Sequence, residues 1–308
     1  MNKRIFIVAF FAFLFLAGSV YAAIGITELR TEQLRNPLGI DVRQPRLGWR
    51  IESDEQNVMQ TAYHILVASS ADLLAQEKGD IWDSGKIESD ASQWIAYQGK
   101  PLKRNARYYW KVKVYTNRGE ADWSAPAFWS MGLLNEADWQ GQWIGLDRTT
   151  PGDSETQWSR LAARYLRKEF ALSKEVKRAT VHIAGMGLYE LFINGQRIGD
   201  QVLAPAPTDY RKTILYNTYD VTPQLRKENA IGVTLGNGRF YTMRQNYKPY
   251  KIPTFGYPKL RLNLIVEYMD GSKETIATNT SWKLTTEGAI RSNNEYDGEE
   301  YDLSLIHI

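Results

Sequence analysis

Short runs in which apolar and polar residues alternate recur along the chain and predict strands rather than helices. The clearest run is 108–115, where the even-numbered residues are Tyr, Trp, Val and Val and the odd-numbered residues are Tyr, Lys, Lys and Tyr. Period-two alternation places these two sets on opposite faces of a strand. In the first half of the chain the pattern indicates strands at 47–51, 61–68, 94–97, 108–115 and 127–129, with a helical turn only at 70–76.

The segment 188–222 predicts a hairpin followed by an irregular connector. Asn194-Gly195 is a strong hairpin signal, because both central residues of a type I′ turn need a positive φ. Pro205 and Pro207 cannot donate to a central ladder, which indicates a loop or a sheet edge. We expect a small antiparallel unit here, and the second half of the chain adds strands at 164–170, 179–184, 189–193, 214–219, 230–235, 259–268, 273–277 and 282–285.

Length and composition indicate an ordinary globular chain of about two domains. The 308 residues carry a formal net charge of +3, with both signs interspersed, so neither a nucleic-acid nor a membrane-surface partner is indicated. The 18 Tyr and 10 Trp suit either β-sandwich cores or sugar-stacking platforms. We interpret most of them as core residues, since aromatic side chains dominate strand packing.

The first 22 residues are typical of a secretory signal peptide. Lys3 and Arg4 precede an apolar run, and Val20-Tyr21-Ala22 supplies a cleavage site after Ala22. The chain contains no Cys, so a lipid-anchored cysteine and disulfides are excluded. We therefore expect a secreted or periplasmic bacterial protein that has no membrane association after cleavage and is held together by its core alone.

Several motifs follow one another in the order found in a known family. They are WQGQWIG (139–145), YLRKEFAL (165–172), ELFINGQRIGDQVLAPAPTDYRKTILYNTYDVT (190–222), LGNG (235–238) and GEEYD (298–302). Together they closely resemble the N-terminal β-sandwich region of bacterial α-L-rhamnosidases of glycoside hydrolase family 78. The segment YYWKVKVYTNRG, followed by WSAP, also resembles a late strand of fibronectin type III domains.

The resemblance implies an all-β chain of two sandwiches without the catalytic (α/α)6 toroid. We expect a signal peptide at 1–22, a fibronectin type III-like β-sandwich at 23–133, a jelly-roll-like rhamnosidase N-terminal sandwich at 134–302, and a truncated or non-native tail at 303–308. A naturally short two-domain protein is the other interpretation. Some relatives carry a rhamnose-binding module after the WIG motif, and the short spacing from Gly145 to Tyr165 predicts that this chain lacks it.

No catalytic residue is transferred to this chain. Inverting glycoside hydrolysis needs two carboxyl groups about 6.5–9.5 Å apart, and the resemblance places both on the toroid. The acidic cluster Asp297, Glu299, Glu300 and Asp302 suits either an acid/base pair or a calcium site, but we interpret it as a solvated loop. His64, His182 and His307 are far apart in sequence, so we expect no metal site and no cofactor.

A sugar-binding site is the more credible chemistry, because such sites combine aromatic faces with planar polar side chains. The loop 236–258 concentrates both kinds of residue, although Arg239 stands where family members often carry Trp. Our candidate carbohydrate-binding residues are Arg239, Tyr241, Arg244, Asn246, Tyr247 and Tyr250. The alternative is that this loop packs against a catalytic domain.

Two hypotheses follow from the sequence. In the first, the chain is the non-catalytic N-terminal portion of a secreted α-L-rhamnosidase that removes terminal rhamnose from plant glycosides or polysaccharides. Its partners would then be a rhamnose-containing glycan and the catalytic domain on which it packs. In the second, it is a free-standing carbohydrate-binding or surface-interaction protein.

Overall fold

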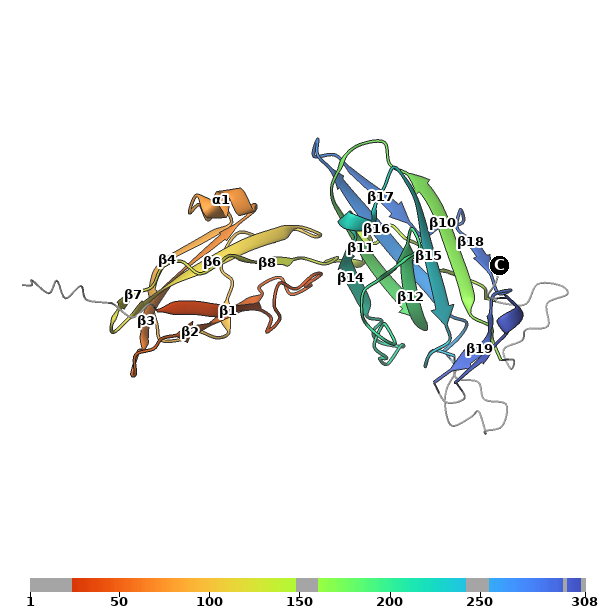
Figure 1. Ribbon diagram of the computed structural model, residues 1–308, viewed down its shortest axis with the longest axis horizontal. Coiled ribbons are helices and arrows are strands. Elements are labelled where there is room, and N and C mark those ends of the chain that lie inside the picture. Colours follow the sequence, from red (N-terminus) through yellow and green to blue (C-terminus); the bar gives the residue numbers. More distant parts are fainter. Residues whose placement is uncertain (1–23, 148–159, 242–254, 296–297, 306–308) are drawn as a thin grey trace, which may run out of the picture.

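The computed structural model describes residues 24–147, 160–241, 255–295 and 298–305. In these ranges the chain forms two antiparallel β-sandwiches that lie end to end along its long axis (Figure 1). The helices of the described residues are one short α-helix and three single 3-10 turns: α1 (Ala71–Ala75), η1 (Glu136–Asp138), η2 (Thr222–Gln224) and η4 (Leu303–Leu305). The predicted all-β fold is confirmed, and among the described residues no helix is long and apolar enough to cross a membrane.

The first sandwich packs a three-stranded sheet against a larger one. The smaller sheet has the order β1 (Gly25–Thr31), β2 (Arg46–Glu52), β5 (Ile95–Ala96). The larger sheet has the order β4 (Trp82–Glu88), β3 (Gln60–Ala68), β6 (Arg107–Thr116), β7 (Gly119–Glu120), with β8 (Ala127–Ser130) also paired to β6. This strand order matches the fibronectin-like arrangement that the sequence predicts.

Large aromatic side chains fill the first core. Trp49, Trp110 and Trp129 are fully buried between the two sheets. The Trp49 indole N–H donates to the Gln60 side chain at 3.0 Å, which satisfies the polar end of that ring. The even-numbered face of β6 points into this core, as the alternation predicts.

In the first sandwich the predicted strands lie where the pattern placed them, but the pattern did not predict β1, β4 or β7. Ser84 and Gly85, residue types that favour a turn, lie inside β4. Gly85 has a φ of 60°, and the pairing with β3 shifts register between His64 and Leu66, so the glycine marks a β-bulge. A bulge and a turn have the same sequence signature, because both require a residue that tolerates positive φ.

The second sandwich packs two larger sheets face to face. One has the order β13 (Gln196–Ile198), β12 (Leu188–Ile193), β15 (Glu228–Gly236), β10 (Arg164–Ala171), β18 (Lys283–Thr285). The other has the order β14 (Tyr216–Asp220), β11 (Val176–Met186), β16 (Lys259–Tyr268), β17 (Lys273–Ala277), with β9 (Ile144–Gly145) paired to β16. A separate hairpin joins β19 (Ile290–Asn294) to β20 (Gly298–Tyr301).

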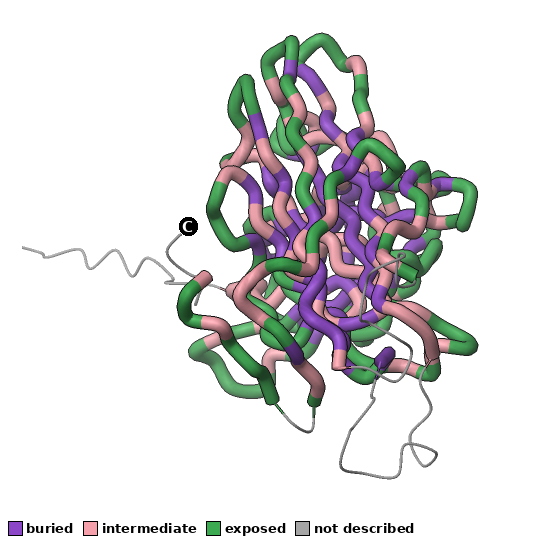
Figure 2. Tube along the Cα trace, turned by 90° about the vertical axis from the view of Figure 1, so that its right-hand side faces the viewer, coloured by how far each residue is buried: buried purple, intermediate pink, exposed green. Residues whose placement is uncertain are grey.

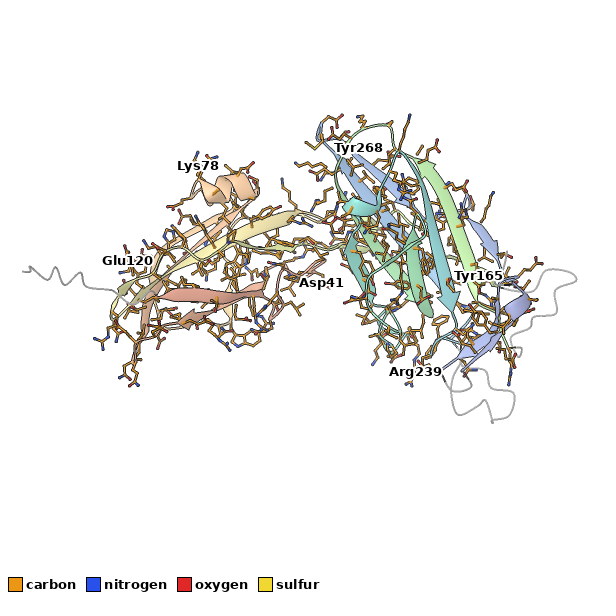
Figure 3. The ribbon with its side chains drawn as sticks, viewed as in Figure 1. Asp41, Lys78, Glu120, Tyr165, Arg239 and Tyr268 are labelled. Carbon is orange, nitrogen blue, oxygen red and sulfur yellow. The ribbon has the colours of Figure 1, made fainter. Side chains whose placement is uncertain are left out.

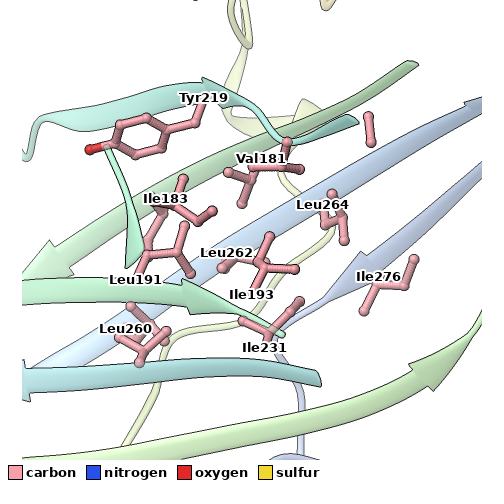
Figure 4. Packing of buried hydrophobic residues seen from close by; sticks show 14 of the residues in the cluster. Val181, Ile183, Leu191, Ile193, Tyr219, Ile231, Leu260, Leu262, Leu264 and Ile276 are labelled. Atoms are coloured by element: carbon pink, nitrogen blue, oxygen red, sulfur yellow. The ribbon is translucent and has the colours of Figure 1, made fainter. Parts of the chain in front are cut away.

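Aliphatic side chains from both sheets form the second core. Val181 and Leu264 from one sheet meet Leu191 and Ile231 from the other, and each is at most 1% exposed (Figure 4). In Figure 2 the buried segments run through the middle of this sandwich, while the turns at its rim are exposed.

The segment 188–222 is divided between the two sheets of this sandwich, so the prediction of a single antiparallel unit was wrong. Asn194 and Gly195 have φ values of 53° and 80°, as a type I′ turn between β12 and β13 requires. The connector then makes one bridge, from Ala204 to Tyr189, before β14 joins the opposite sheet. Pro205 and Pro207 lack the N–H that would continue the first ladder, so the chain crosses over here.

Candidate functional site

The described ends of the loop 236–258 border an aromatic hollow of about 500 Å³. Tyr210, Phe240 and Phe255 form its centre, with ring centroids 5.2 to 6.0 Å apart. Trp143 and Tyr257 complete the aromatic lining. Segments far apart in sequence therefore supply one aromatic surface, because β9 pairs with the start of β16 and draws Trp143 close to the loop base.

The candidate sugar-binding residues that the structure describes play two different parts. Arg239 is half exposed and its Nε lies 3.1 Å from Glu295 Oε2. Tyr241 is only 2% exposed and stacks on Tyr257, with 6.1 Å between the ring centroids. A buried ring offers no face to a sugar, so Tyr241 is a packing residue in this conformation. The other candidates lie outside the described residues: Arg244, Asn246, Tyr247 and Tyr250.

Two residues of this hollow, Tyr210 and Phe255, are not among the candidates predicted from the sequence. Tyr210 ends the Pro-rich connector and Phe255 precedes Gly256, so each looked like a loop residue without a partner. Burial raises the pKa of the Tyr210 hydroxyl, which keeps it a neutral hydrogen-bonding group. The available signal was an aromatic residue within a segment that contains proline or glycine, since Tyr210 follows Pro207 by three residues and Phe255 precedes Gly256.

Charged side chains at the rim of the hollow are held in ion pairs. Lys259 Nζ lies 2.8 Å from Asp147, and Arg211 Nε lies 3.1 Å from Asp209. The hydrogen bond from Arg211 holds the pKa of Asp209 below its ordinary value. A general acid needs a raised carboxyl pKa instead. Aromatic walls with ionised groups at the rim suit binding of a polar ligand rather than acid catalysis.

The acidic cluster near the end of the chain lies on a hairpin, so its interpretation as a loop was wrong. Glu299 and Glu300 belong to β20 and are exposed, and Glu300 forms an ion pair with Arg160. Asp302 accepts hydrogen bonds from Ser304, which lower its pKa. Asp297 lies outside the described residues. Pairing with β19 explains the strand, because the GEEY segment has few apolar residues that would have signalled it.

The histidines do not meet in the described part of the chain. His64 Nε2 lies 2.6 Å from Asp83 in the first sandwich, and His182 lies in the second. His307 lies outside the described residues. Within 24–147, 160–241, 255–295 and 298–305, no group of three or more His, Asp or Glu side chains is placed to hold a metal ion.

A polar joint connects the two sandwiches. Asn105, from the first sandwich, contacts His182 Nε2 through its side-chain oxygen at 3.2 Å and accepts from Arg178 through its carbonyl at 2.7 Å. Arg107 reaches Asp220 at 2.7 Å. Burial alone would raise the pKa of Asp220, but hydrogen bonds from Thr222 and the Arg107 ion pair hold it below its ordinary value. Such paired charges fix the orientation of the two sandwiches.

Two glycines allow the backbones of the sandwiches to approach each other at this joint. A Cβ on Gly132 would lie 2.1 Å from the Tyr216 hydroxyl, and one on Gly39 would lie 2.2 Å from Thr218 Oγ1. The Tyr216 hydroxyl also accepts from the Leu133 backbone N–H at 3.0 Å. Leu133, the last residue of the predicted first domain, is therefore held against the second sandwich.

Comparison with known proteins places both sandwiches. Residues 26–135 match the family model "Rha78A-like, N-terminal immunoglobulin domain", and residues 174–306 match "Alpha-L-rhamnosidase N-terminal domain". An alpha-L-rhamnosidase of Formosa agariphila is 40% identical over 287 residues, which are 87% of this chain and 30% of that protein.

Two solved structures show the same arrangement. The alpha-L-rhamnosidase from Dictyoglumus thermophilum has a TM-score of 0.81 and 40% sequence identity, and the match covers 91% of this chain and 32% of the rhamnosidase chain. The Streptomyces avermitilis alpha-L-rhamnosidase complexed with L-rhamnose has a TM-score of 0.80 and 25% identity, covering 92% and 43%. This chain thus spans about a third of the length of most of these relatives. On these matches, the chain carries the N-terminal region of the α-L-rhamnosidase family.

Proposed function

We propose that this chain is the non-catalytic N-terminal accessory region of a secreted α-L-rhamnosidase. In the whole enzyme a separate catalytic domain would remove terminal α-L-rhamnose from plant glycosides or polysaccharides with inversion. The observation that carries this proposal is that both family models match in succession, while the curated relatives extend well beyond the matched part.

The role of this region would be to hold the catalytic domain and to line the approach of the substrate. The polar joint supports that role, because Asn105, Arg107 and Gly132 fix one sandwich against the other. The aromatic hollow beside Arg239 would contact either a rhamnose-containing glycan or the catalytic domain. Residues 1–22 would direct export and be removed after Ala22.

An activity assay tests the non-catalytic part of this proposal. We expect the mature chain, from residue 23 onward, to release no p-nitrophenol from p-nitrophenyl α-L-rhamnoside above background. The Dictyoglumus thermophilum enzyme serves as the positive control under the same conditions. Turnover by the purified chain that survives further purification would contradict our placement of the acid and base on another domain.

The alternative function is a free-standing carbohydrate-binding protein, which the matches to much longer rhamnosidases do not favour. The two functions differ in the reading frame after Asp302. Several hundred codons with helical periodicity would select the accessory region, whereas an authentic stop codon would select the binding protein. Titration with L-rhamnose in a calorimeter, for the chain and for Arg239→Ala, then tests whether the hollow binds sugar.

A further inference from the structure

The outward face of β15 carries small side chains along the centre of its sheet. Alternation directs Ile231, Val233 and Leu235 into the core, where each is at most 2% exposed. The residues between them, Gly232 and Thr234, face away from the core. β15 lies at the centre of its sheet, between β12 and β10 (Figure 1). Its outer surface is low because Gly232 and Thr234 have small side chains.

Taller side chains stand on both sides of this low strand. Gly232 is paired with Phe192 of β12 on one side and with Arg167 of β10 on the other. Thr234 lies in the same way between Glu190 and Tyr165. Since neighbouring strands are about 4.8 Å apart, the two walls are about 10 Å apart and the floor is one strand wide. The result is a trough that follows β15.

Two adjoining cavities occupy the trough. One of about 600 Å³ lies over Gly232, and one of about 550 Å³ continues past Gly236, with Thr234 lining both. From Ala230 to Gly236 the floor is about 20 Å long, at about 3.3 Å per residue. A trough of this length suits an extended ligand rather than a single small molecule.

Gly232 leaves the trough open, although the fold does not require a glycine at this position. A Cβ built on it would meet only the Phe192 Cβ, at 3.9 Å, and its φ lies outside the left-handed region. Neither crowding nor backbone strain therefore requires glycine here. Glycine weakens the interior of a strand and commonly marks a place where a ligand approaches the backbone closely.

We propose that this trough binds an oligosaccharide laid along β15. Tyr165, which is labelled in Figure 3, and Phe192 supply apolar ring surfaces for the faces of the sugar rings. The Tyr165 hydroxyl accepts a hydrogen bond from the Ile290 backbone N–H at 3.1 Å. Glu190 lies 3.3 Å from Arg197, which gives planar acceptor and donor groups on the β12 side. Few polar groups among apolar walls is the usual composition of a ligand site.

Charge on the walls favours a sugar over a docked protein domain. Arg167 Nη2 lies 2.7 Å from Glu169 on one wall, and Glu190 pairs with Arg197 on the other. A flat protein surface would remove all four charged groups from water, and the free energy of desolvation would exceed the free energy gained from the two ion pairs. A narrow polar ligand can use these groups as hydrogen-bonding partners and leave them hydrated on their outer sides.

Filling the trough tests the proposal. We would compare the parent chain, Gly232→Trp, and Thr275→Trp, which adds the same indole to the outward face of β17 in the opposite sheet. Affinity electrophoresis in gels that contain rhamnogalacturonan I, with dextran gels as reference, measures binding, and thermal unfolding measures stability. We expect at least tenfold weaker retardation for Gly232→Trp only, with a melting temperature no lower than that of Thr275→Trp.

The choice of a rhamnose-containing probe rests on the proposed function, whereas the existence of the trough follows from the strand pairing and does not depend on that function. Equal retardation of Gly232→Trp and the parent, or no retardation of the parent, would overturn the proposal and leave the accessory role untouched. Adding a separately produced rhamnosidase catalytic region gives the remaining outcome. If Gly232→Trp abolishes its binding to the chain while rhamnogalacturonan I does not compete, the trough is a protein-docking surface and the proposal is wrong.

Discussion

Mild acid should loosen the joint between the two sandwiches, because the joint holds a histidine in its neutral form. His182 is fully buried, with Nδ1 2.9 Å from Thr218 Oγ1 and Nε2 3.2 Å from Asn105 Oδ1. Burial, with a smaller contribution from the nearby Arg178 charge, lowers the pKa of His182 from 6.5 to about 4. Tyr216 packs edge-on against the imidazole, with 5.9 Å between the ring centroids, and provides no counter-charge.

The pKa difference sets both the sign and the size of the effect. In the unfolded chain His182 is protonated below about pH 6.5, whereas in the folded chain it stays neutral down to about pH 4. The free energy of unfolding therefore decreases as the pH falls through this window. Each unit of pKa difference is worth about 1.4 kcal/mol, which gives a loss of about 2 kcal/mol between about pH 7.5 and pH 5. The full loss approaches about 3 kcal/mol at lower pH.

Urea denaturation across this pH range measures the effect, with His182→Gln as the matched variant. The variant keeps a hydrogen-bonding side chain but does not titrate, and every other ionisable group is common to both proteins. The free energy of unfolding of the parent should fall more steeply than that of the variant between about pH 7.5 and pH 5. Parallel curves would refute the reasoning, because they would mean that His182 gains its proton equally in both states.

Three further predictions concern packing. Gly132→Ala should destabilise the joint by about 1–3 kcal/mol, because the new methyl group meets the Tyr216 hydroxyl, and limited proteolysis should then cut between the sandwiches sooner than in the parent. Leu264→Ala should cost about 3 kcal/mol in urea denaturation, since its side chain is fully buried; a change below 1 kcal/mol would mean that the second core is loosely packed. Tyr241→Ala should lower the melting temperature while Arg239→Ala leaves it nearly unchanged, because the tyrosine is buried and the arginine is half exposed.

The local pattern was sufficient for most strands but not for the way they assemble. Alternation in β6 and the Asn194-Gly195 turn act over a few residues, so their structure could be predicted directly. The bulge at Gly85 and the weakly apolar β20 depend on a partner strand, which the chain pattern does not contain. The crossover after β13 likewise depends on which sheet has a free edge.

The candidate site shows the same division. The family motifs indicated the loop 236–258, and Arg239 does lie exposed beside the hollow. Tyr241 resembled a sugar-stacking residue in sequence but is buried, since stacking on Tyr257 is a long-range contact. The trough on β15 could not be predicted from the sequence, because its walls are formed by Phe192 and Arg167 on strands that pair with Gly232 only in the folded chain.

The polar character of the joint has an evolutionary consequence. Each sandwich closes its own apolar interior, and the contacts between them are hydrogen bonds and ion pairs such as those of Asn105 and Arg107. Separating the two would expose mainly groups that water can solvate, as is common for interfaces between domains of one chain. Recombination that transplants the first sandwich to another protein would therefore carry little risk of aggregation, and only a handful of complementary side chains would have to be regained.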